Sequence, residues 1–206
     1  MILRVVTGRI RPGELESVTS SFRSGFGDVA RATVGLDRFV AGTRPDGNGG
    51  HVLAIATIWA DVDAAVTALG GDLAGLTMID GTDHGAALER VDYYELEELR
   101  TRAGETEPGL LRLTAGTVAR GLDADMQQEL RGRLGDLPDE AAEAYVGRRV
   151  LGRLVEIAFV STWSTRPKTL RLDEPIWPGI SNRYESFRMD VLEVFLSGVG
   201  RAATRP

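Results

Sequence analysis

The chain has 206 residues, of which 43% are hydrophobic and 26% are charged, so it can form one large domain or two smaller ones with buried cores. Its formal net charge of −6 argues against a general nucleic-acid binder, which would present a basic surface. The sequence has no cysteine, which excludes disulfide bonds, thiolate metal sites and cysteine nucleophiles. No apolar run approaches the length that crosses a membrane, and charges interrupt the place of a signal-peptide core. These features predict a cytoplasmic protein that binds neither membranes nor nucleic acid.

Four strand-like blocks occur in the same order in the two halves of the sequence, which is typical of an internal repeat. The first pair shares Leu, Arg and Gly at identical spacing, and both members of the third pair end in Trp. Each block is a short run of β-branched, aliphatic or aromatic residues, as in half-buried strands. We therefore predict a tandem duplication. The aligned pairs are 3–10 with 111–118, 38–42 with 148–152, 53–59 with 157–163, and 91–96 with 189–194.

A helical pattern follows the first strand block in each half. Apolar residues recur there at spacings of three and four, so each set forms one stripe that can face a core. The stripes are Leu15, Val18, Phe22 and Phe26 in the first half, and Leu122, Met126, Leu130 and Leu134 in the second.

A second helix is predicted after the third block of the first half. Asp61 can cap its start and Gly70 can adopt the left-handed turn at its end. Three prolines occupy the corresponding part of the second half and exclude a long regular helix, so we expect a loop with at most one helical turn. These prolines are Pro167, Pro175 and Pro178.

The order of elements predicts an α+β fold made of two ferredoxin-like β-α-β-β-α-β repeats with antiparallel sheets. The glycine-rich stretch 45–50 predicts a hairpin turn between the second and third strands. The expected organisation is a first repeat over residues 1–100, a linker over 101–108, a second repeat over 109–198 and a tail over 199–206.

A third strand that ends in Trp and leads into the next element occurs at residues 55–61 and again at 159–164. In this feature the chain resembles the antibiotic-biosynthesis-monooxygenase group of the dimeric α/β-barrel superfamily. The resemblance implies that the two sheets close into a barrel with the helices outside. Two separate subunits usually build that barrel, so a fused pair implies a monomer that acts as a pseudo-dimer. Further self-association stays open.

The resemblance implies a cofactor-independent monooxygenase that acts on an aromatic or polycyclic small molecule. The alternative is a non-catalytic small-molecule-binding or interaction protein that keeps the barrel without an active site. The haem-degrading branch of the family is disfavoured, because its Asn is missing from residues 3–10 and 111–118, and its Trp and His are missing from residues 62–69. We therefore expect no cofactor.

Trp59 and Trp163 are the first candidates for substrate binding. They could line a pocket between sheet and helices, where a flat aromatic molecule would stack on their rings. The alternative is that both are core or barrel-closing residues, since large aromatic side chains dominate burial.

Arg4 and Arg112 occupy matched places on the first strands and could bind an anionic ligand if they point into the barrel. The preferred alternative is an ion pair across the sheet with Glu95 or Glu193, because opposite charges on neighbouring strands stabilise a sheet modestly.

The catalytic candidates are His84 and Tyr94. An imidazole titrates near neutral pH and could transfer a proton, but a solvated loop histidine is the alternative for His84, and His51 is expected to be exposed as well. Tyr93 and Tyr94 alternate on one strand, so one should face inward and could bind a substrate hydroxyl, with a satisfied core tyrosine as the alternative.

Asp80, Asp83 and His84 lie close together in the sequence but do not make a convincing metal site. A hard cation needs six or more oxygen ligands, and zinc needs converging nitrogen or sulfur donors. We therefore expect no metal.

Overall fold

The computed structural model describes residues 1–71, 78, 84–101, 107–165 and 182–201. The chain divides into two compact units. The first unit consists of Met1–Tyr93 with Glu193–Pro206, and the second unit consists of Tyr94–Leu192. The two boundaries fall inside strands β4 (Ala87–Thr101) and β8 (Ser186–Val199), so each unit contains part of both strands.

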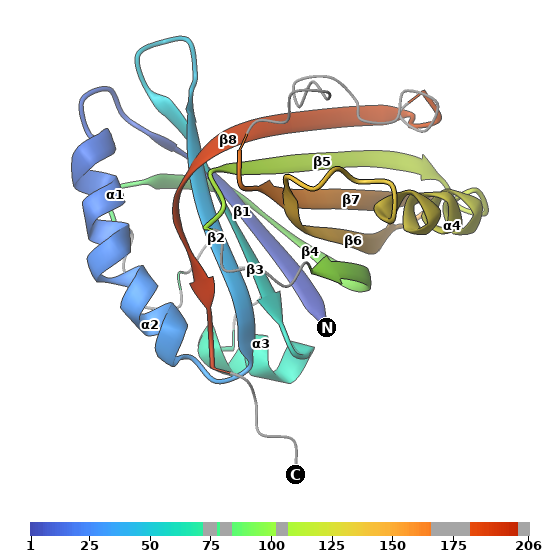
Figure 1. Ribbon diagram of the computed structural model, residues 1–206, viewed down its shortest axis with the longest axis horizontal. Coiled ribbons are helices and arrows are strands. Elements are labelled where there is room, and N and C mark those ends of the chain that lie inside the picture. Colours follow the sequence, from blue (N-terminus) through green and yellow to red (C-terminus); the bar gives the residue numbers. More distant parts are fainter. Residues whose placement is uncertain (72–77, 79–83, 102–106, 166–181, 202–206) are drawn as a thin grey trace. The chain divides into compact units, whose positions relative to one another are not determined.

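In the first unit the strands follow the order β4-β1-β3-β2-β8, and helices lie against one face of this sheet (Figure 1). The apolar stripe predicted from Leu15 to Phe26 spans two helices rather than one, because the chain breaks at Gly25. Asp61 caps the next helix as predicted, accepting a hydrogen bond of 2.8 Å from the Ala64 amide. The elements are β1 (Ile2–Ile10), α1 (Leu15–Ser24), α2 (Phe26–Ala32), β2 (Leu36–Pro45), β3 (His51–Trp59) and α3 (Val62–Ala68).

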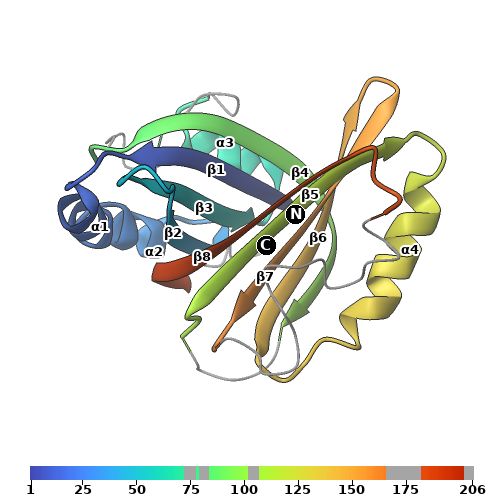
Figure 2. The same cartoon turned by 90° about the horizontal axis from the view of Figure 1, so that it is seen from above.

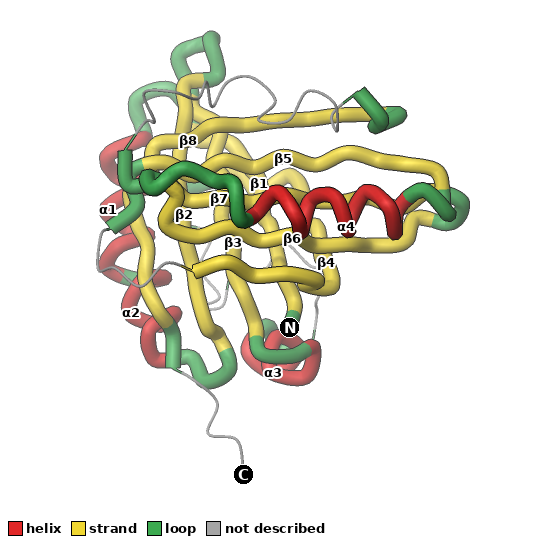
Figure 3. The backbone as a smooth tube through the Cα atoms, turned by 45° about the vertical axis from the view of Figure 1, so that its right-hand side comes forward, coloured by secondary structure: helices red, strands yellow, loops and turns green. Residues whose placement is uncertain are grey.

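In the second unit the strands follow the order β8-β5-β7-β6-β4. One helix, α4 (Asp123–Leu134), covers one face of this sheet, as Figures 2 and 3 show. The predicted proline-rich loop lies largely outside the described residues. The remaining elements are β5 (Leu110–Ala119), β6 (Ala141–Leu151) and β7 (Leu154–Trp163).

Both units therefore place the fourth strand of a repeat beside the first, the first beside the third, and the third beside the second. This is the strand order of the predicted ferredoxin-like repeat. β4 continues to Thr101, where the linker was expected to begin, and β8 continues to Val199, where the tail was expected to begin. Arg201 still forms a bridge with Val34, while residues 102–106 and 202–206 lie outside the described part of the chain.

The strand registers of the two units coincide when they are counted from the two tryptophans. Trp59 pairs with Ile2, and Trp163 pairs with Leu110. In both units the second strand has a bulge close to the tryptophan of that unit. The bulge precedes Arg38 in β2 and Glu143 in β6. The two units thus have matched strand registers and matched bulges, as a tandem repeat predicts.

One predicted alignment is wrong. Gly42 pairs with Ala54 on β3, and Gly147 pairs with Ala158 on β7, so residues 38–42 correspond to 143–147 rather than to 148–152. The reason is that Gly152 is not a strand residue. It has a φ of +65° and lies in the tight turn between β6 and β7.

Each unit has its own apolar core between its helices and its sheet. In the first unit, Phe22 and Phe26 pack with Ile55 and Trp59. In the second unit the predicted stripe of α4 packs with β7, except for Leu122, which is exposed and precedes the helix. No helix in the described ranges is long and apolar enough to cross a membrane. The second core includes Met126, Leu130, Leu134, Val155, Ile157, Phe159 and Trp163.

Asp123 fastens the start of α4 to the sheet. Its Oδ1 accepts a hydrogen bond of 2.9 Å from the Gly121 amide, and its Oδ2 accepts bonds of 3.0 and 2.9 Å from the Arg148 guanidinium. The backbone hydrogen bond from Gly121 and the bonds from Arg148 hold the pKa of the Asp123 carboxyl below its usual value, against the effect of desolvation.

We predict that Asp123→Asn lowers the free energy of unfolding at neutral pH by roughly 1.5–3 kcal/mol, because charge-assisted hydrogen bonds are lost. A carboxyl whose pKa is lower in the folded state stabilises above its unfolded pKa of about 3.9, and this contribution disappears as the pH falls through the folded value. The difference between wild type and Asp123→Asn should therefore shrink below about pH 4 in urea titrations. Asp125→Asn, an exposed change in the same turn, is the control and should differ from wild type by only a few tenths of a kcal/mol. A difference for Asp123→Asn that is constant with pH would contradict this role.

Candidate functional site

The same set of three buried side chains occurs in both units. In the first unit, Trp59 Nε1 donates a hydrogen bond of 3.0 Å to Thr57 Oγ1, and Thr57 pairs with Arg4 across β1 and β3. Trp59 is fully buried, and Arg4 and Thr57 are each 2% exposed. Alternation along the strand puts Thr57 on the same face as Ile55 and Trp59, which is the face that the helices cover.

The second unit repeats this arrangement. Trp163 Nε1 donates a hydrogen bond of 2.9 Å to Ser161 Oγ, and Ser161 pairs with Arg112 across β5 and β7. All three residues are buried, and they lie on the face that α4 covers. Both tryptophans are thus packed in a core with their indole N–H groups satisfied, which matches the core alternative. The sites predicted from the sequence are brought together pairwise, each Arg with the Trp of its own unit.

The two arginines differ in their surroundings. Arg4 Nε donates a hydrogen bond of 2.8 Å to the Tyr93 hydroxyl, and its guanidinium lies 5.8 Å from the centre of the Tyr93 ring. Arg112 Nη2 instead lies 2.9 Å from the thioether sulfur of Met189. Burial lowers the pKa of Arg112 to about 10, because desolvation disfavours the charged form. A guanidinium with this pKa is still protonated at neutral pH, so the second unit holds a desolvated cation in its core.

Two further polar side chains of the second unit are buried on the same side. Thr114 follows Arg112 by two positions on β5 and so shares its face, and Gln127 follows the core residue Met126 on α4. Each is 8% exposed. Thr114 Oγ1 and Gln127 Nε2 have no hydrogen-bond partner among the described residues. Buried polar groups usually have partners, so these two atoms require an explanation.

Tyr184 closes this side of the sheet near Gly116. A Cβ atom on Gly116 would lie 2.3 Å from Tyr184 Cδ1, so only glycine lets the ring approach β5 this closely. Tyr184 also packs against the core of the second unit, and burial raises the pKa of its phenol above the usual value. Sequence reasoning missed Thr114, Gln127 and Tyr184. The one local signal was a glutamine directly beside the apolar stripe of α4.

His84 is buried, which corrects the expectation of a solvated loop residue. It is 6% exposed, its Nδ1 lies 2.8 Å from Ser21 Oγ, and its ring lies 4.4 Å from the Phe22 ring. Its φ of 51° is in the left-handed region. His51 is half-buried rather than exposed. His84 is therefore held against α1, while Asp80 and Asp83 lie outside the described residues.

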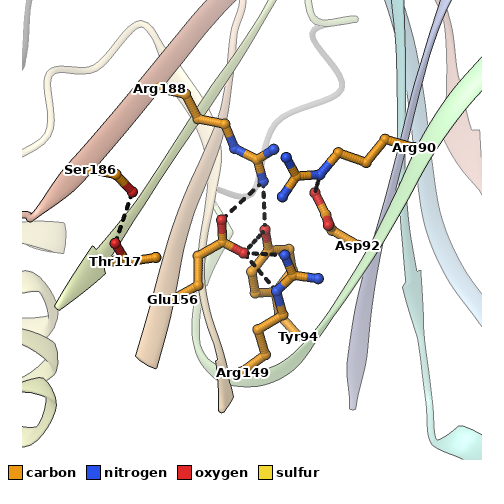
Figure 4. A network of polar contacts seen from close by, with 8 residues as sticks. All are labelled: Arg90, Asp92, Tyr94, Thr117, Arg149, Glu156, Ser186 and Arg188. Atoms are coloured by element: carbon orange, nitrogen blue, oxygen red, sulfur yellow. Dashed lines mark hydrogen bonds and ion pairs between the residues drawn. The ribbon is translucent and has the colours of Figure 1, made fainter. Parts of the chain in front are cut away.

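Tyr94 belongs to a polar cluster of the second unit (Figure 4). Its hydroxyl donates a hydrogen bond of 3.1 Å to Glu156 Oε2 and accepts one of 3.0 Å from Arg188 Nη2. Tyr93, the preceding residue, instead accepts a hydrogen bond from Arg4. The two tyrosines thus bond to different side chains, as expected for neighbouring residues on opposite faces of a strand. Within the described residues, no group of three or more His, Asp or Glu side chains could hold a metal ion.

Solved structures with the same fold include proteins described as oxygenases or oxidases. A provisionally assigned monooxygenase from Fusobacterium nucleatum has a TM-score of 0.68 and 11% identity, covering 96% of this chain and 94% of that chain. One from Lactobacillus acidophilus has a TM-score of 0.69 and 11% identity, covering 97% and 96%. An anthrone oxidase-like protein has a TM-score of 0.57 and 12% identity, covering 100% and 97%.

At these identities the likeness shows the fold alone. No protein-family model matches the sequence, and no curated protein matches it.

We predict that Ser161→Ala lowers the free energy of unfolding by about 1–3 kcal/mol, because the buried Trp163 N–H loses its acceptor. Ser161→Thr should cost less, since it restores the hydroxyl found at the equivalent position 57. Chemical denaturation followed by tryptophan fluorescence measures both. If Ser161→Ala unfolds at the same denaturant concentration as wild type, the hydrogen bond does not hold the indole in place.

Proposed function

We propose that the chain binds an acidic aromatic small molecule, such as a polycyclic phenol, between α4 and the sheet of the second unit, and oxidises it with O2. The observation that carries this proposal is the buried guanidinium of Arg112 on the same sheet face as Thr114, whose hydroxyl has no partner in the described part of the chain.

Such a ligand would contact three buried polar groups. An anion or a polarised oxygen within hydrogen-bonding distance binds well to a buried guanidinium. A buried hydroxyl or carboxamide without a partner costs roughly 1–3 kcal/mol, which a ligand oxygen would recover. The thioether of Met189 offers apolar contact to a flat ring system.

The first unit does not offer the same groups. Arg4 already donates to a tyrosine hydroxyl, and Val6 stands at the position of Thr114. Thr19 stands at the position of Gln127, and its hydroxyl donates to the Glu16 carbonyl. The equivalent polar groups are thus either satisfied by the chain or replaced by apolar ones, which favours the second unit as the binding unit.

The chemistry follows from the cation. Arg112 would stabilise the phenolate over the phenol, and a phenolate gives electrons to O2 more readily. In the overall reaction a phenol and O2 yield a quinone and water, so one oxygen atom enters the ring, the other leaves as water, and no external reductant is needed. This class of reaction, a cofactor-independent oxidation of a phenol, is the one that the family resemblance implies.

We further propose that the two sheets form a pseudo-dimeric α/β barrel within one chain. The support is that β4 and β8 each continue from one unit into the other. A protein of this kind should sediment as a monomer, because one chain supplies both sheets.

We predict that Arg112→Lys weakens binding of a hydroxylated polycyclic aromatic by roughly 10- to 100-fold, because lysine cannot replace the planar guanidinium. Arg4→Lys, the matched change in the first unit, should leave the affinity unchanged.

Gln127→Met should weaken binding without lowering stability, because it removes a buried group that lacks a partner in the free protein. Isothermal titration measures the affinity, and an oxygen electrode measures turnover.

Equal effects of Arg112→Lys and Arg4→Lys would contradict the assignment to the second unit. Binding without oxygen uptake would favour the alternative, a non-catalytic small-molecule-binding protein.

A further inference from the structure

A single acidic residue interrupts the apolar sequence of β7. Val155 and Ile157 pack with α4 in the core of the second unit, so alternation along the strand turns Glu156 to the opposite face of the sheet. Glu156 is nevertheless only 5% exposed. A buried carboxylate is costly unless cations and hydrogen-bond donors surround it.

Three other strands of the same sheet supply these groups (Figure 4). Arg149, which pairs directly with Glu156 across β6 and β7, places Nε 2.6 Å and Nη2 2.5 Å from Glu156 Oε2. Arg188 of β8 places Nη2 3.3 Å from Glu156 Oε1 and donates to the Tyr94 hydroxyl. Arg149 also lies 5.2 Å from the centre of the Tyr94 ring. The carboxylate and the tyrosine thus fix both guanidiniums.

The part of this cluster that solvent reaches is cationic. The side chain of Glu156 is 7% exposed, whereas those of Arg149 and Arg188 are 22% and 38% exposed. Both guanidiniums contact this carboxylate. Asp190 lies two positions after Arg188 on β8, and its negative charge favours a small anion over a polyanion here.

We propose that Arg149 and Arg188 bind a small oxyanion, the phosphate or carboxylate group of a small molecule, on the face of the second unit's sheet opposite α4. A guanidinium presents paired N–H donors that match such oxygens, and a guanidinium already held by buried partners loses little freedom when it binds. This site is separate from the one beside Arg112, which lies on the face that α4 covers.

The first unit lacks the anchor for such a site. Arg44 occupies the position of Arg149, but its pairing partner on β3 is Val52, where the second unit has Glu156. Arg44 donates a hydrogen bond of 3.1 Å to the Pro45 carbonyl. Arg44→Gln is therefore a matched control, because it removes the same charge at the same place in the other copy.

The test uses the full chain with millimolar inorganic phosphate or acetate, each compared with chloride at equal ionic strength. We expect isothermal titration to detect binding of at least one of the two anions to wild type. Arg188→Gln should weaken that binding at least tenfold, and Arg44→Gln should not change it. Binding of phosphate alone points to a phosphorylated ligand, and binding of acetate alone points to a carboxylate.

Circular dichroism checks that Arg188→Gln is folded. The double variant Arg149→Gln with Glu156→Gln is a second test, because it removes the site while leaving a neutral hydrogen-bonding pair, and it should also lose binding. The proposal is overturned if wild type binds neither anion, or if Arg188→Gln and Arg44→Gln weaken binding equally, which would indicate general attraction to positive charge.

Discussion

The structure depends on the antiparallel pairing of the first and third strands of each repeat in a register that ends at a buried tryptophan. The indole N–H of that tryptophan needs an acceptor inside the core, and the hydroxyl two residues earlier supplies it in both units. This hydroxyl residue pairs with an arginine on the first strand, so the same register that buries the tryptophan also buries a cation.

The buried arginine has different neighbours in the two units. In the first unit the Tyr93 hydroxyl accepts a hydrogen bond from the guanidinium of Arg4. In the second unit the guanidinium of Arg112 lies beside the Met189 thioether, and Thr114 Oγ1 and Gln127 Nε2 lack hydrogen-bond partners within the described chain. The units also differ on the sheet face opposite the helices, where Val52 of the first unit corresponds to Glu156 of the second. The two units thus share a backbone pattern but differ in the side chains around the buried arginine.

Much of this fold could be predicted from the sequence, because three strand blocks share apolar alternation and fixed Arg, Gly, Trp or Glu positions. The second block was misaligned because a turn glycine, Gly152, resembles the strand glycine Gly147, and only the bulged register distinguishes them. The burial of His84 depends on Ser21 and Phe22, which are far away in the sequence. The Glu156 cluster joins four strands, so no local pattern could reveal it. Arg4, Arg112 and the two tryptophans were found because repetition marks them.

The most direct test of this account is a crystal structure of the protein soaked with a hydroxylated polycyclic aromatic such as 1-naphthol. The account predicts one bound molecule between α4 and the sheet of the second unit, with its oxygen within hydrogen-bonding distance of Arg112 and no molecule beside Arg4. A ligand bound beside Arg4 instead, or a second unit in which Thr114 and Gln127 hydrogen-bond to each other around a filled core, would contradict it.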